Sequence, residues 1–65
     1  MKPYHEQLTE CNMLIQQYKL EFNQLTIKET KDAKDYIRLK YLDGEIDEES
    51  GSLQIKKRRL MNLIN

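Results

Sequence analysis

Residues 4–25 read YHEQLTECNMLIQQYKLEFNQL, and apolar or aromatic side chains recur in this stretch at alternating intervals of four and three residues. The members of this heptad seam are Tyr4, Leu8, Cys11, Ile15, Tyr18, Phe22 and Leu25. A helix with this spacing places all seven side chains on one stripe, which other helical surface must cover. The seam therefore predicts a long amphipathic helix over about residues 4–25 and an all-α fold.

The length of the chain bears on how the seam is covered. Sixty-five residues suffice for a single small helical interaction domain over residues 1–65. A core of this size rarely supplies more than roughly 3–5 kcal/mol, and small chains usually add a disulfide, a metal or a partner. One cysteine and one histidine are too few for an intramolecular disulfide or a structural zinc site. We therefore predict self-association through the heptad seam, as a homo-oligomer, most simply a dimer.

The seam cannot continue far past Leu25, because its next positions are the acidic residues Glu29 and Asp32. Two outcomes are open over residues 26–32. The chain turns there, with Thr26 and Glu29 spaced as a capping box or Thr30 starting the second helix, or one long helix continues. We favour the turn.

The second and third helices follow from apolar spacing and turn residues. Helical spacing of apolar residues predicts a second helix over about residues 30–43, and Asp43-Gly44 is its expected stop. Asp47 offers an N-cap, and the last helix is expected over about residues 52–64. The sequence thus predicts a helical hairpin or a small three-helix unit.

No catalytic, metal or cofactor site can be assembled from the sequence. Cys11 lies in the seam, and His5 is too far around the helix to serve as its base. The acidic run that begins at Asp43 fails the calcium-loop pattern, since Glu48 and Gln54 stand where a glycine and a glutamate are required. We expect no enzyme activity, no cofactor and no small-molecule substrate.

Several apolar residues lie outside the seam and are candidates for a partner-binding surface. Met13, Leu20 and Ile27 are spaced by seven and fall opposite the seam, although they also fit a description as scattered surface residues. Tyr36 and Tyr41 lie on different faces of the second helix, so one of them is expected to reach solvent or a partner.

The basic run Lys56, Lys57, Arg58 and Arg59 is the one feature that suggests nucleic acid. Four consecutive side chains point around the whole helix, so only two or three can meet one phosphate backbone. The formal net charge of the chain is zero, and an acidic block over residues 43–49 offers a competing partner for these charges.

These patterns favour a non-enzymatic protein–protein interaction module, such as a small adaptor, inhibitor or regulator of a larger protein. The alternative is a small nucleic-acid-binding regulator that uses Lys56–Arg59, and the third possibility is a structural coiled-coil subunit of an assembly. With no apolar run long enough to span a membrane and no leader pattern, we expect a cytoplasmic protein with no membrane partner.

Overall fold

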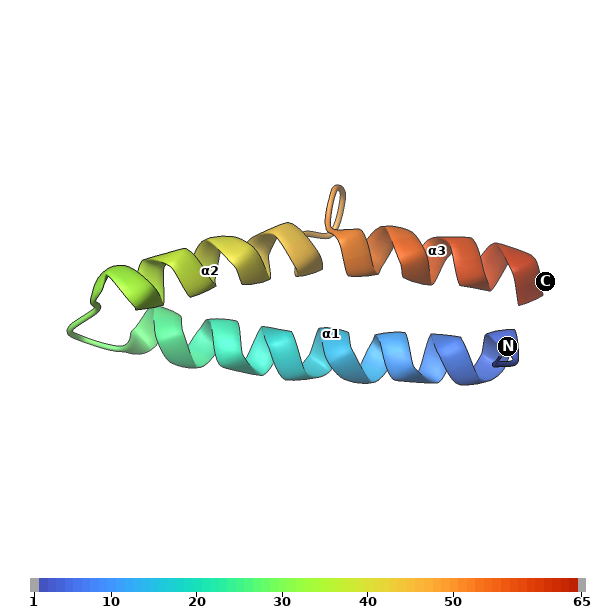
Figure 1. The fold of residues 1–65 in the computed structure, drawn as a ribbon, viewed down its shortest axis with the longest axis horizontal. Helices are drawn as coiled ribbons and strands as arrows, with labels where there is room; N and C mark the ends of the chain where they lie inside the picture. The colour runs from blue at the N-terminus through green and yellow to red at the C-terminus, as the bar shows by residue number, and fades with distance from the viewer. Residues whose placement is uncertain (1, 65) are drawn as a thin grey trace.

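Three α-helices make up the part of the chain that the computed structural model describes, residues 2–64 (Figure 1). They are α1 (Tyr4–Ile27), α2 (Ala33–Ile46) and α3 (Ser52–Ile64). Helices α2 and α3 follow one another along α1 and run antiparallel to it, so the start of α1 and the end of α3 share one end (Figure 1). The fold is therefore all-α, as predicted, and the described residues measure 44 × 18 × 18 Å.

The heptad seam forms the inner face of this hairpin. Cys11 and Ile15 pack against Leu60 of α3, with the half-buried Leu8 and Leu53 beside them. The farther half of the seam lies along α2, where Tyr18, Phe22 and Leu25 are half-buried. Tyr4, at the open end, remains 42% exposed.

The chain's own α2 and α3 thus cover the seam that the sequence offers for self-association. A second copy could reach the buried Cys11 and Ile15 only if the hairpin opened and α1 exchanged its partner, as in a domain swap. Self-association through the seam stays a prediction, and it now carries the cost of opening the hairpin.

The first turn lies where the sequence predicts it, between Ile27 and Ala33, so a single long helix is wrong. The expected capping residues are also wrong. Thr26 lies within α1, and its hydroxyl donates to the carbonyl of Phe22 at 2.8 Å. Thr30 precedes the start of α2 by three residues, so it does not begin that helix.

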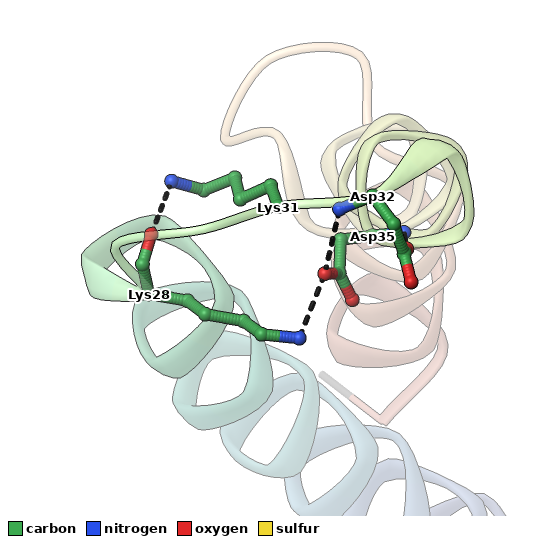
Figure 2. Close-up of polar contacts among 4 residues, drawn as sticks. All are labelled: Lys28, Lys31, Asp32 and Asp35. Atoms are coloured by element: carbon green, nitrogen blue, oxygen red, sulfur yellow. Dashed lines mark hydrogen bonds and ion pairs between the residues drawn. The ribbon is translucent and has the colours of Figure 1, made fainter.

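A capping box at Asp32 and Asp35 begins α2 instead. The carboxylate of Asp32 accepts from the backbone N–H of Asp35 at 3.0 Å, and Asp35 accepts from the N–H of Asp32 at 3.2 Å (Figure 2). Lys28 Nζ donates to Asp35 at 2.8 Å, while Lys31 Nζ donates to the carbonyl of Lys28 (Figure 2). The hydrogen bond from Lys28 lowers the pKa of Asp35. The same hydrogen bond links the end of α1 to the first turn of α2.

The predicted end of the second helix at Asp43-Gly44 is wrong, because the second turn begins later in the chain. Gly44 lies inside α2, which continues to Ile46. Asp47 does not cap α3, because its carboxylate accepts from the backbone N–H groups of Glu49 and Ser50 and from the Ser50 hydroxyl. The hydrogen bonds from Ser50 lower the pKa of Asp47. Helix α3 begins at Ser52, as expected.

Gly51 occupies the tightest point of this turn. Its N–H donates to the carbonyl of Asp47 at 2.9 Å, and its own carbonyl accepts the first hydrogen bond of α3 from Ile55. A Cβ at this position would lie 2.5 Å from the Asp47 oxygen and 2.7 Å from that of Glu45. Both are backbone atoms, so a side chain cannot fit unless the turn shifts.

The seam residue Ile15 and the exposed Ile27 offer a matched test of this packing, since they are 3% and 79% exposed on the same helix. Ile15→Ala should destabilise the protein by about 2–5 kcal/mol, because it leaves a cavity between α1 and α3. Ile27→Ala should change stability by less than about 0.5 kcal/mol. Urea unfolding followed by circular dichroism measures both, and equal losses at the two positions would contradict the hairpin.

Substitution of the two glycines by alanine should change the free energy of unfolding in opposite directions. Gly51→Ala should lower the free energy of unfolding by about 1–3 kcal/mol, because the added methyl collides with backbone. Gly44→Ala should raise it by about 0.5–1 kcal/mol, since Gly44 is exposed inside a helix with no atom near its Cβ position. Thermal unfolding of both variants provides the measurement, and a tolerated alanine at position 51 would contradict the close approach of Gly51 to the backbone of Asp47 and Glu45.

Candidate interaction surface

The hairpin is two helices wide along its whole length, and this leaves much apolar surface uncovered. Two packed helices bury one stripe each, whereas their outer faces stay in water. Within residues 2–64 only four hydrophobic side chains are buried, and these are Cys11, Ile15, Leu42 and Leu60. The exposed large hydrophobic residues are Tyr4, Met13, Leu14, Leu20, Ile27, Tyr36, Ile37, Tyr41, Ile55, Met61 and Leu63.

An open groove lies between the first turns of α1 and the length of α3. We call it the end groove; its walls and floor are Tyr4, Gln7, Ser52, Ile55, Lys56, Arg59, Leu60 and Leu63. It encloses about 510 Å³. Tyr4, Ile55 and Leu63 are 42%, 43% and 52% exposed, so the groove combines accessible apolar side chains with two basic ones.

A smaller hollow of about 150 Å³ lies at the same end, lined by His5, Leu8, Met61 and Ile64. Met61 and Leu63 are two residues apart, so they leave α3 about 200° from one another. The hollow and the end groove therefore lie on different sides of the contact between α1 and α3. Sequence reasoning missed Ile55, Met61 and Leu63 as surface residues, although their helical spacing from Leu60 indicates that they lie beside the buried stripe of α3.

The structure divides the predicted basic run among different roles. Lys56 and Arg59 line the end groove. Arg58 donates from Nη2 to the backbone carbonyl of Glu49 at 2.8 Å, and Lys57 is half-buried. None of the ion pairs formed within residues 2–64 involves any of the four. The four charges therefore do not form one continuous patch, and the acidic block 43–49 reaches the run only through a backbone carbonyl.

Tyr41 takes part in a cluster within the hairpin. Its ring meets that of Tyr18 edge-on, with centroids 6.3 Å apart, and the Arg38 guanidinium lies 5.1 Å and 5.6 Å from the two centroids. Arg38 also donates a hydrogen bond to each carboxylate oxygen of Glu21, at 2.6 and 2.9 Å. These hydrogen bonds hold the pKa of Glu21 below its ordinary value of 4.5. Sequence reasoning missed Arg38 and Glu21, which meet only once the register between α1 and α2 is known.

The other proposed partner-binding residues remain in solvent. Met13, Leu20 and Ile27 are 57%, 61% and 79% exposed on the outer side of α1, and Tyr36 is 61% exposed on α2. Met13 lines open hollows of about 400 and 290 Å³ that are formed by residues of α1 alone. The structure therefore does not bring these residues together with the end groove.

The reactive side chains are separated as the sequence suggests. Cys11 is buried, and its thiol donates to the carbonyl of Leu53 at 3.3 Å, while His5 lies exposed on the first turn of α1. No cluster of three or more histidine, cysteine or acidic side chains suited to a metal ion occurs over residues 2–64. None of the helices in that range is long and apolar enough to cross a membrane. Comparison of the chain with protein-family models, curated proteins and solved structures finds no match.

The pair between Glu21 and Arg38 predicts a pH dependence. A carboxylate whose pKa is lowered on folding stabilises the protein above its unfolded pKa, and this contribution is lost as pH falls through the folded value. The unfolding midpoint of the parent should therefore exceed that of Glu21→Gln at neutral pH, and the gap should close below about pH 4.

Urea titrations at neutral and acidic pH measure this gap. Glu29→Gln is the matched control. Glu29 is exposed in the loop between α1 and α2, and its side chain makes no hydrogen bond within residues 2–64. Its midpoint should follow that of the parent throughout. A gap for Glu21→Gln that is the same at both pH values would contradict the ionic pairing.

Proposed function

We propose that the protein is a non-enzymatic protein–protein interaction module, a small helical adaptor, inhibitor or regulator that binds a larger protein through the end groove. The observation that carries this proposal is the exposure of Tyr4, Ile55 and Leu63 around one groove at the open end of the hairpin. An apolar groove with a few polar groups on its rim is the usual form of a helix- or peptide-binding surface.

The thin core supports the same proposal. The described residues bury only four hydrophobic side chains, and such a core stabilises a chain of this size by only a few kcal/mol. A partner that binds the folded form raises its stability in proportion to the logarithm of ligand concentration over Kd. Covering the end groove would therefore both recognise the partner and strengthen the hairpin.

The alternative is a small nucleic-acid-binding regulator that uses Lys56–Arg59. The placement of the four basic side chains disfavours this alternative. Arg58 donates a hydrogen bond to the backbone carbonyl of Glu49, and Lys57 is half-buried. The third possibility is a structural subunit of a homo-oligomeric assembly. It gains support from the stripe Met13, Leu20 and Ile27, which stays exposed along α1.

Photocrosslinking in the native host separates these three. Benzoylphenylalanine is introduced at position 63 in the end groove. The matched control carries it at Gln24, which is exposed near the other end of α1 and does not line the groove. Under our proposal, position 63 gives a discrete adduct with another protein, at least about tenfold stronger than position 24.

The other outcomes are equally informative. Adducts that nuclease digestion removes would favour the nucleic-acid-binding regulator, and adducts with a second copy alone would favour the structural subunit. Equal labelling from the two positions, or none from either, would overturn the end groove as a protein-binding surface.

A further inference from the structure

We propose that the end groove takes a particular class of partner: an acidic amphipathic helix, whose apolar side chains contact Tyr4, Ile55 and Leu63 and whose carboxylates meet Lys56 and Arg59. This inference rests on the proposed function and names the chemistry of its partner. It follows from the charge of the groove, its apolar content and its position between two helices.

The charge of α3 is one-sided although the chain is neutral. Residues 52–64 contain four basic and no acidic side chains, whereas the acidic block 43–49 precedes them. Lys56 and Arg59 are three residues apart, on neighbouring turns of α3, and both line the groove. Neither forms an ion pair with a carboxylate of residues 2–64. The groove therefore offers two unneutralised cations at a spacing that a helix with acids three or four residues apart can match.

The apolar part of the groove points to an amphipathic partner. Ile55, Arg59 and Leu63 follow one another at intervals of four residues, so the basic side chain stands between two apolar ones along one edge of α3. Tyr4 forms the opposite edge from α1. A partner with carboxylates alone would leave these apolar side chains in water, and a purely apolar partner would desolvate two unpaired cations.

A helical partner fits the shape. The groove runs along α3 from Ser52 to Leu63, which is about 16 Å of helix or three turns. A third helix laid between α1 and α3 would pack ridges into grooves against both, and it would convert this end of the hairpin from two helices into three. The exposed side chains of Tyr4, Ile55 and Leu63 would then become core residues of a small bundle.

Nucleic acid satisfies these observations less well. A phosphate backbone could neutralise Lys56 and Arg59, but it offers no apolar group for Ile55 or Leu63. Tyr4 on the opposite edge of the groove offers one ring, but α3 carries no aromatic side chain among its basic residues on which successive bases could stack.

The test is a selection from a displayed library of randomised peptides of about 14 residues, roughly four helical turns, against the immobilised full-length chain. We expect the enriched peptides to be net acidic, with apolar residues at helical spacing. Their binding should shift the amide resonances of α3 and of the first turn of α1 in a nitrogen-15 spectrum of the full chain. Binding should weaken in high salt, because the ion pairs at the rim are screened.

Charge-reversed variants make the selection decisive. The double variant K56E/R59E should bind the enriched acidic peptides at least about tenfold more weakly, and a new selection on it should enrich basic peptides instead. The matched control is Lys40→Glu, since Lys40 is exposed on α2 and does not line the groove. It should bind the acidic peptides as the parent does, and circular dichroism confirms that each variant is folded.

Three results would overturn the proposal. Enriched peptides that are neutral or basic, resonance shifts confined to residues outside the groove, or a selection that enriches nothing would each exclude an acidic helix as the partner. None of these outcomes bears on whether position 63 crosslinks to a protein, so this inference can fail while the proposed function stands.

Discussion

The packing of the α1 seam against α2 and α3 is the contact on which the rest of the structure depends. One continuous helix supplies one side of the interface, and two shorter helices share the other. Cys11 and Ile15 meet Leu60 of α3, while Tyr18 faces Tyr41 of α2. Because neither short helix is long enough to be stable alone in water, both derive their stability from contact with α1.

Both turns serve this packing by local hydrogen bonds. At the first, the capping box of Asp32 and Asp35 begins α2 at the point where its apolar face meets α1, and Lys28 binds the same box from the end of α1 (Figure 2). At the second, the carboxylate of Asp47 accepts three hydrogen bonds, and the lack of a side chain at Gly51 lets the backbone approach Asp47 closely. The loop projects away from the hairpin, so α3 resumes nearly in line with α2 (Figure 1).

A hairpin two helices wide explains why a small folded chain displays so many apolar side chains. Each helix buries one stripe, and nothing in residues 2–64 covers the outer faces. At the end of the hairpin that holds Tyr4 and Leu63, this exposure coincides with basic side chains and a groove between two helices. Along the outer side of α1 it leaves Met13, Leu20 and Ile27 exposed, and Met13 lines hollows formed by residues of α1 alone. The two surfaces differ because the end groove is lined by two helices and carries Lys56 and Arg59, whereas the hollows beside Met13 are lined by α1 alone.

The sequence by itself determined the all-α class, the three helices and the inner face of α1, because heptad spacing is a local property that any neighbouring helix satisfies. It also favoured a break within residues 26–32, since acidic residues cannot continue an apolar seam. Only the tertiary structure decided that α2 and α3 cover that seam, that Gly44 lies within a helix, and that Tyr4 joins Ile55 and Leu63 in one groove. Those outcomes depend on the register between antiparallel helices. The register determines which side chains distant in the sequence come into contact, and no local sequence pattern specifies it.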